Sequence, residues 1–297
     1  MKLFTISQND AEQRLDKFLK KLFPRATRSL IYKFNRKGKI KVQPHPNPLL
    51  RSNFEDSRAS TPVSLILPKE RELGFKKQDN EYKLQVGDVV KIFLSDKDFD
   101  ELSKASVNDE VRNVELKVKL NPKDIVYEDG DLLVLNKNPG INVHPGDHKS
   151  KEVSVIEQAQ DYLGEKLNSL TFKPSLVHRI DRDTSGILLI AKTKSLLTRL
   201  VNDFKDHKKV TKIYVALCVG HAEKQSGVID APLRRIENAT KENKVQVDAR
   251  GQKAVTHYLV LEEYQVDTGQ EVIPVSLVQA QLETGRMHQI RVHLASI

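Results

Sequence analysis

The sequence lacks the features that mark membrane and secreted proteins. Its longest apolar runs, Ile187–Ala191 and Val215–Val219, are five residues each, whereas a membrane-spanning helix needs about 20 apolar residues. The first eight residues show no apolar segment or small-residue cleavage site, so no secretory signal is expected. The single cysteine, Cys218, cannot form an internal disulfide and lies in an apolar run typical of core packing. These absences exclude a membrane span and favour a reducing cytoplasm.

Positive charge is concentrated near the N-terminus. The 297 residues carry 49 Lys+Arg and 40 Asp+Glu, a formal net charge of +9. Residues 14–41 hold eleven of the cations and one acid, Asp16, so this segment nets +10 and the remainder nets −1. A solvated helix face usually carries charges of both signs. A run in which nearly all charges are positive therefore favours contact with a nucleic acid. The length predicts about two domains.

Two amphipathic helices are predicted to carry this charge. Leucines and phenylalanines recur at helical spacing from Leu15 to Phe23 and Pro24 ends the pattern, which predicts a helix over about 10–23. Thr27 is the predicted N-cap of a second helix, and Gly38 its C′ residue before a strand over 39–43. The cations of both helices point away from the apolar stripe. The basic patch predicted to bind RNA consists of Lys17, Lys20, Lys21, Arg28, Lys33, Arg36, Lys37 and Lys39.

The rest of the chain alternates irregular segments with short apolar runs. Residues 44–81 are predicted to be an irregular insertion, 82–94 two strand-like runs joined at Gly87-Asp88, and 96–113 a polar linker. Beyond the linker, helices are predicted over 152–163 and 195–206. Strands are predicted over 124–128, 132–136, 141–144, 175–180, 187–192, 212–219, 254–262 and 275–282. Because strands outnumber helices and often follow one another directly, the expected fold class is α+β.

Most familiar catalytic signatures are absent. There is no glycine-rich phosphate loop, no His-Glu-x-x-His, no paired cysteines and no Gly-x-Ser-x-Gly. The nine histidines are scattered, so no metal site is expected. One polar loop stands out, at 178–186 between two apolar runs. Its Asp, Thr, Ser and Gly residues form turns readily, but two arginines, two aspartates and a histidine exceed what a hairpin needs.

A second polar cluster, at 283–295, follows a predicted strand and is predicted to open a helix. In a helix, His288, Arg291 and Ala295 share one face, while Ile290 and Leu294 lie on the other. Arg291 could therefore be aimed at a neighbouring strand end. An arginine aimed at a carboxylate in a cleft holds that carboxylate ionised.

These clusters resemble the motifs of a known family. Residues 178–186, His-Arg-Ile-Asp-Arg-Asp-Thr-Ser-Gly, resemble the His-Arg-Leu-Asp-x-x-Thr-Ser-Gly motif of the RluA family of RNA pseudouridine synthases. Residues 284–295 are similar to that family's C-terminal arginine motif, and 134–145, 212–216 and 251–256 match in order and spacing. In the N-terminal part, Arg14–Leu19, Arg28-Ser29 and Gly87-Asp88 resemble the alpha-L RNA-binding domain named for ribosomal protein S-four.

The resemblance implies a two-domain organisation. An alpha-L domain is expected over 1–95, with the insertion at about 44–81, followed by a linker at 96–113 and a catalytic domain over 114–297. The implied fold is a catalytic domain on a largely antiparallel mixed β-sheet with flanking helices, plus a small N-terminal α/β RNA-binding domain. Family members continue past the arginine motif through a strand-rich segment, so the catalytic domain is expected to be truncated at Ile297.

The implied activity is isomerisation of uridine to pseudouridine in structured RNA, with large-subunit ribosomal RNA favoured over transfer RNA. Asp181 is the implied nucleophile, Tyr214 stacks on the uracil, and Arg291 pairs with Asp181. No cofactor, no metal and no membrane partner are expected, and a monomer is the simplest expectation. The alternatives are a non-catalytic RNA-binding or ribosome-assembly protein and a glycosylase that releases uracil. Further residues implied in substrate binding are His178, Arg179, Arg182, Thr184, Arg286 and His288.

Overall fold

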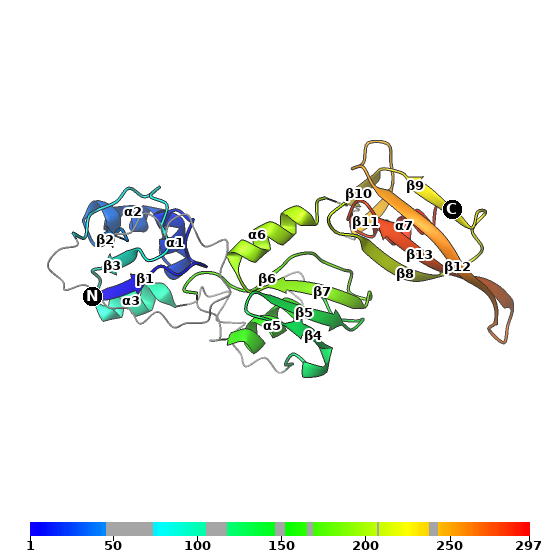
Figure 1. Ribbon diagram of the computed structural model, residues 1–297, viewed down its shortest axis with the longest axis horizontal. Helices are drawn as coiled ribbons and strands as arrows, with labels where there is room; N and C mark the ends of the chain where they lie inside the picture. The colour runs from blue at the N-terminus through cyan, green and yellow to red at the C-terminus, as the bar shows by residue number, and fades with distance from the viewer. Residues whose placement is uncertain (46–73, 105–117, 146–151, 165–168, 207, 238–242) are drawn as a thin grey trace. The chain divides into compact units, whose positions relative to one another are not determined.

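The protein folds into two compact units, Met1–Leu197 and Thr198–Ile297. The computed structural model describes residues 1–45, 74–104, 118–145, 152–164, 169–206, 208–237 and 243–297, and Figure 1 shows the elements of each unit. All strand pairings among these residues are antiparallel. The fold class is α+β, as predicted. None of the helices in the described ranges combines the length and apolar composition needed to cross a membrane.

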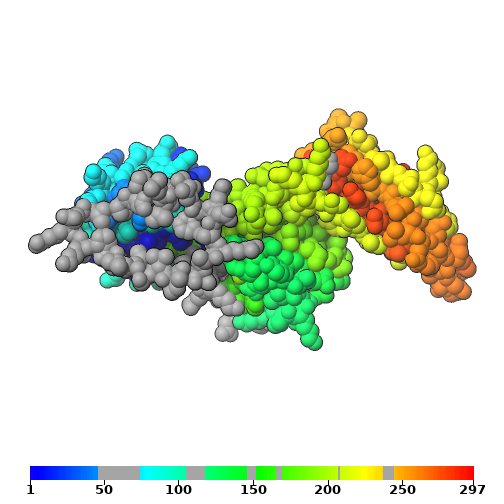
Figure 2. Space-filling view, viewed as in Figure 1, coloured from blue at the N-terminus to red at the C-terminus, as the bar shows by residue number. Residues whose placement is uncertain are grey.

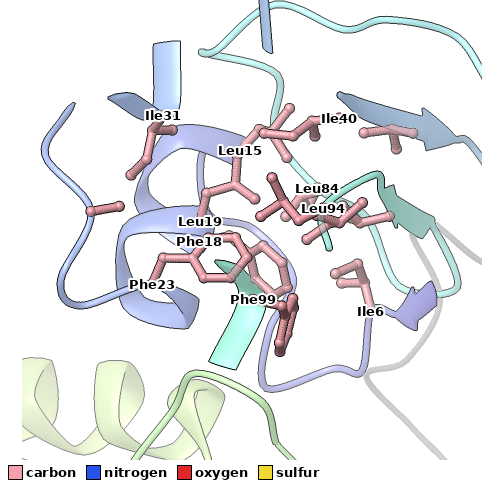
Figure 3. Packing of buried hydrophobic residues seen from close by; sticks show 14 of the residues in the cluster. Ile6, Leu15, Phe18, Leu19, Phe23, Ile31, Ile40, Leu84, Leu94 and Phe99 are labelled. Atoms are coloured by element: carbon pink, nitrogen blue, oxygen red, sulfur yellow. The ribbon is translucent and has the colours of Figure 1, made fainter. Parts of the chain in front are cut away.

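The N-terminal lobe of the first unit, residues 1–45 and 74–104, packs three helices against a small sheet. The sheet has the strand order β1-β3-β2. The core contains Phe18 and Leu19 of the first helix and Phe23 directly after it, all fully buried. It also contains Phe99, whose ring stacks on Phe4 and meets Phe23 edge to face. Figure 3 shows Phe18, Leu19, Phe23 and Phe99 gathered in this core. The elements are β1 (Lys2–Thr5), α1 (Leu15–Leu22), α2 (Arg28–Arg36), β2 (Ile40–Gln43), β3 (Val89–Ile92) and α3 (Asp96–Ser103).

Local signals in this lobe are confirmed, with two differences. The Thr27 side chain accepts a hydrogen bond from Leu30 N and caps α2, and Gly38 has a positive φ of 70° after it. Helix α1 begins at Leu15 instead of about 10, because the N–H groups of Glu12, Leu15 and Asp16 donate to backbone carbonyls of residues 80–84. The first half of the predicted linker forms α3, which packs through Phe99. Most of the predicted insertion, 46–73, lies outside the described residues.

The central lobe of the first unit, residues 118–197 where described, is a four-stranded sheet with the order β4-β5-β7-β6. The predicted strand at 141–144 is wrong, because the carbonyls of Asn142 and Val143 accept hydrogen bonds from Val155 N and Ile156 N at the start of α5. The predicted strand at 175–180 shortens to two residues. The elements are η2 (Pro122–Asp124), β4 (Ile125–Glu128), β5 (Leu132–Lys137), α5 (Val155–Leu163), β6 (Ser175–Leu176) and β7 (Gly186–Ala191), followed by α6 (Lys194–Asp203).

The second unit is built on another four-stranded sheet, of order β8-β13-β12-β9, beside a two-stranded β10-β11 hairpin. Its core contains Tyr258, Val260 and Val278, against which Leu294 of α7 packs. The β12–β13 hairpin projects beyond this core as an exposed arm (Figures 1 and 2). The elements are β8 (Lys212–Val219), β9 (Ser226–Asp230), β10 (Leu233–Glu237), β11 (Asn243–Val247), β12 (Val255–Asp267), β13 (Val272–Leu282) and α7 (Gln289–Leu294).

The strands described after residue 114 therefore form two four-stranded antiparallel sheets and a hairpin, where the sequence predicts one mixed sheet. Strands that follow one another through short turns pair antiparallel, since a parallel pair needs a long crossover. Cys218 lies in β8, half-buried against the core of the second unit, and burial raises the pKa of its thiol.

Candidate active site and nucleic-acid interface

The polar loop at 178–186 joins β6 to β7 in the central lobe. It contains a tight turn in which Thr184 N donates to Asp181 O at 3.2 Å. Gly186, where β7 begins, has a φ of 120°, a conformation that only glycine adopts without strain. Leu188, Ile190 and Ala191 of β7 are fully buried, whereas Ile187 on the opposite face is exposed. The turn is thus held at the end of a rigid strand, with Asp181 half-buried on it.

Lys137 supports this turn from beneath. It is the last residue of β5, opposite Gly186 of β7, and is 3% exposed. Its ammonium donates to the carbonyl of Arg182 and to that of Asn138, both at 2.7 Å. Burial lowers the pKa of Lys137, while the charges of Asp183 and Asp181 oppose that shift. Sequence reasoning placed Lys137 in a matching stretch without a role; the cross-strand register makes it the support of the Asp181 turn.

A second connection holds the same turn to residue 140. Gly140 N donates to Arg182 O at 2.9 Å, and the Arg182 guanidinium returns a hydrogen bond to Gly140 O at 3.1 Å. The guanidinium also pairs with Glu152 at 3.3 Å. Arg182, predicted to bind substrate, is therefore partly engaged in holding the loop, although half of its side chain is exposed.

The other predicted residues of this loop divide between interior and surface. The His178 ring accepts a hydrogen bond from Leu189 N through Nε2 at 3.3 Å, so it faces the β7 backbone. Arg179 is exposed, and its charge together with burial lowers the pKa of His144. Arg179, Asp181 and Thr184 thus lie on one loop of the first unit, and His144 of the same unit lies near enough for the charge of Arg179 to act on it.

In the second unit, the arginine motif forms the turn before α7 and the helix itself. His288 occupies the N-cap position with a left-handed φ of 55°. The Arg286 side chain donates through Nε to Lys253 O at 3.1 Å, and the backbone N–H of Arg286 donates to Gln289 Oε1 at 3.0 Å. Arg291 lies on α7, and Tyr214 lies on β8 opposite Ala280 of β13. Predicted residues from two motifs are thus placed on the same sheet-and-helix unit.

A buried polar network fixes α7 against this sheet, and sequence reasoning missed it. Gln289 donates to Val255 O and to Thr256 Oγ1, each at 3.0 Å. The His293 ring is fully buried between Thr256 Oγ1 and Ala231 O, both at 2.9 Å. Because buried polar groups need partners, these contacts set the position of α7 and hence of Arg291. The signal was the polar spacing of Gln289 and His293, four apart on one helical face.

The three implied catalytic residues are divided between the units. Asp181 belongs to the first, and Tyr214 and Arg291 belong to the second. The first unit thus holds a supported carboxylate, and the second holds an aromatic strand residue and an arginine on a fixed helix.

The basic patch lies on α1, α2 and the turn that follows them in the N-terminal lobe. Seven of its eight residues are exposed, and Lys39 is half-buried. Lys20 is partly structural, because its ammonium donates to Pro24 O and Ala26 O at the end of α1. Lys39 lies 5.5 Å from the centre of the Phe34 ring. The remaining patch residues present their charges to solvent.

A surface cavity of about 590 Å³ adjoins the patch. Lys33 and Arg36 of α2 and Lys77 of the facing loop bring three cations to it, against the one carboxylate of Asp79. The side-chain amide of Asn35 joins the two walls by donating to Gln78 O at 2.9 Å and to the side-chain oxygen of Asn80 at 2.8 Å. This side of α2 therefore attracts anionic groups such as phosphates.

Known proteins of one family match this chain over most of its length. The family model for RNA pseudouridylate synthase matches residues 131–296. Ribosomal large subunit pseudouridine synthase C of Pasteurella multocida (strain Pm70) is 34% identical, over 99% of this chain and 74% of that protein. Ribosomal large subunit pseudouridine synthase D of Salmonella typhimurium (strain LT2) is 32% identical, over 99% of this chain and 72% of that protein.

Among solved structures, Human RNA Pseudouridylate Synthase Domain Containing 4 is 26% identical, with a TM-score of 0.44. The match covers 59% of this chain and 64% of the chain in that structure, which is less than two thirds of it. The sequence relatives confirm the predicted family resemblance. A family model that matches more than half of the residues, and relatives at 31–36% identity over nearly the full chain, show that the chain belongs to the RNA pseudouridylate synthase family.

Proposed function

We propose that this chain converts specific uridines of large-subunit ribosomal RNA to pseudouridine. The observation that carries the proposal is Asp181, held on a tight turn by the buried ammonium of Lys137 within the segment that matches the family. The names of the curated relatives, ribosomal large subunit pseudouridine synthases C and D, support this choice of RNA. A ribosomal RNA substrate also fits the predicted reducing cytoplasm.

The reaction exchanges one bond for another within a single nucleotide. The N1–C1′ bond breaks, the uracil turns, and C5 bonds to C1′; C5 then loses its proton and N1 gains one. Atoms and electrons balance without a redox partner or a cosubstrate. An ionised aspartate is a competent nucleophile, and we assign this role to Asp181, with attack at C1′ or at C6 as the two routes. Because a stacked base is out of reach, the uridine must be extruded into the site.

The other residues take supporting roles in this proposal. Arg291 and Tyr214 of the second unit take the roles that the family resemblance implies: the arginine as the partner of the nucleophile, and the tyrosine as the residue that stacks on the extruded uracil. The exposed charges of Arg179 and Arg182 hold phosphates beside the extruded nucleotide. The polar network that fixes α7 supports the role of Arg291, since it limits the directions available to this helix. His178, Thr184, Arg286 and His288 complete the substrate-binding surface.

We infer that the N-terminal lobe binds the RNA as an alpha-L domain over 1–95, upstream of a catalytic domain over 114–297. Its cations are arranged on exposed faces of α1 and α2 around an apolar core, which suits phosphate contacts that do not depend on base sequence. Such contacts provide affinity, while the Asp181 loop selects the base. We propose that the protein works as a monomer.

The proposal is tested with purified protein and ribosomal RNA transcripts. Pseudouridine is detected by carbodiimide-dependent primer-extension stops, and free uracil is measured by chromatography. We expect pseudouridine with wild type, none with Asp181→Ala, and nearly wild-type rates with Asp183→Asn. The last variant is the matched control, because Asp183 is an exposed carboxylate on the same turn.

The outcomes separate the alternatives. Activity that persists in Asp181→Ala refutes the mechanism. A wild-type protein that binds RNA but modifies no uridine favours a non-catalytic binding or assembly role. Release of free uracil instead of pseudouridine identifies a glycosylase.

A further inference from the structure

A buried carboxylate joins the N-terminal lobe to the central lobe inside the first unit. Asp10, in the segment between β1 and α1, is fully buried. Its oxygens accept hydrogen bonds from the hydroxyl of Ser169 at 3.0 Å and from the backbone N–H groups of Leu170 and Thr171 at 2.9 and 2.8 Å. The Thr171 hydroxyl donates to it at 2.7 Å, as does Ser7 from its own lobe. Five donors thus surround one carboxylate, and four of them come from a segment about 160 residues away.

Neighbouring residues of the same segment strengthen this connection. Gln13 donates to the Thr171 hydroxyl at 2.9 Å. Asn9 accepts a hydrogen bond from Lys194 N, the first residue of α6, at 3.2 Å, and Ala11 O accepts one from the Lys194 ammonium at 2.7 Å. We name these contacts between residues 9–13 and residues 169–171 and 194 the interlobe latch.

The latch meets the central lobe just upstream of the candidate catalytic loop. Thr171 lies four residues before β6, which pairs with β7, and the Asp181 loop joins these two strands. The segment that receives the hydrogen bonds of Asp10 is therefore continuous with the support of Asp181. Because a buried carboxylate that loses its donors is left uncompensated, the latch favours one docked arrangement over partly docked ones.

We propose that Asp10 is a positioning residue that locks the basic lobe to the central lobe, so that RNA held by the basic patch presents one uridine to Asp181. This inference rests on the proposed function. Without the latch the lobe still binds RNA, but the bound RNA loses its fixed register relative to the catalytic loop. Asp10 thereby contributes to which uridine is modified, although it contacts neither the RNA nor the reacting atoms.

The docked arrangement is tested first, without any RNA. Spin labels are placed at Lys97→Cys on α3 and Lys123→Cys on η2, both exposed, in a Cys218→Ser background. Double electron–electron resonance then reports the distance between the lobes. We expect a narrow distribution for the unmodified latch and a broad one for Asp10→Asn and for Thr171→Val. Asp100→Asn, which neutralises an exposed carboxylate of the same lobe, is the matched control and stays narrow.

The catalytic consequence is tested with the same variants. We expect the single-turnover rate on long ribosomal RNA to fall about 10-fold or more in Asp10→Asn, in line with the sensitivity of such reactions to small misplacements. RNA affinity should be unchanged, as should the rate on a short hairpin that carries only the target uridine. Thermal unfolding is measured for each variant, and Thr171→Val, which keeps the side-chain shape, carries the test if Asp10→Asn does not fold.

Two results overturn the inference. One is a distance distribution that stays narrow in folded Asp10→Asn or Thr171→Val. The other is a loss of rate that is equal on long RNA and on the short hairpin, because this indicates general damage instead of lost register. A wild type without activity on any RNA refutes the proposed function, yet the distance measurement still decides whether the latch exists.

Discussion

Replacing Lys137 with methionine tests the support beneath Asp181. The methionine keeps most of the apolar stem of a side chain that is 3% exposed, but it removes the ammonium that donates to Arg182 O and Asn138 O. Arg182 O retains its hydrogen bond from Gly140 N, so the turn is loosened on one side only. The change therefore separates the positioning of Asp181 from the integrity of the sheet.

The expected magnitude follows from the two lost hydrogen bonds. Each bond from a charged donor contributes about 1.5–3 kcal/mol. Part of this is offset because methionine no longer bears the cost of burying a charge, the cost that lowers the pKa of Lys137. We expect the free energy of unfolding to fall by about 2–4 kcal/mol. A displacement of Asp181 by about 1 Å is expected to lower kcat by about 100-fold.

Two assays measure these effects, with Lys192→Met as the matched control. Urea unfolding gives the free energy, and single-turnover pseudouridine formation at a temperature where the variant is folded gives the rate. Lys192 is also largely buried in the central lobe and donates to Glu128 at 2.9 Å and to Asp129 O, but neither partner belongs to the Asp181 loop. Lys192→Met should lose stability and keep its rate. The reasoning fails if both variants lose rate equally, or if Lys137→Met retains wild-type kcat once folded.

Two further predictions concern charge. Burial lowers the pKa values of Lys137, Lys194 and Lys212 from the ordinary 10.5, so the unfolded chain binds these protons more tightly. The free energy of unfolding should therefore increase, and the protein become more stable, as the pH rises through the folded pKa values toward 10.5. Urea unfolding across that range should show a shallower rise in Lys137→Met than in wild type; parallel curves would contradict this assignment. Neutralising Lys33, Arg36 and Lys37 should weaken RNA binding and reduce the slope of log affinity against log salt by about 2–3, whereas an unchanged slope in a filter-binding titration would exclude phosphate contacts by these exposed side chains.

Helices α1 and α2 were predictable because their signals are local. The apolar spacing from Leu15 to Phe23 and the Thr27 cap act within one or two turns, and both are confirmed. Helix α3 carries no comparable stripe, since half of its residues are acidic and Phe99 is its one buried side chain. Its burial depends on Phe4 and Phe23, which are distant in sequence. Composition alone therefore predicted a linker there.

The error at 141–144 has a similar origin. Alternating apolar residues there match a strand, but the backbone carbonyls of Asn142 and Val143 bond to the start of α5 instead of to a neighbouring strand. Local pattern describes which side chains can be buried. It does not determine which hydrogen-bond partners the backbone groups of the segment will find in the folded chain. In this segment, those partners decided the structure.

By itself, the sequence determined the family and the α+β class, and it predicts which residues do the chemistry, because motifs and periodicities depend on neighbours along the chain. Only the tertiary structure decided what positions them. Lys137 supports a turn 45 residues away, and Asp10 bonds a segment 161 residues away. Both are buried polar groups with only one neighbour in sequence among their partners, and such groups are stable only where the folded chain brings the remaining donors or acceptors to them. Their roles therefore follow from the path of the chain, which no short stretch of sequence contains.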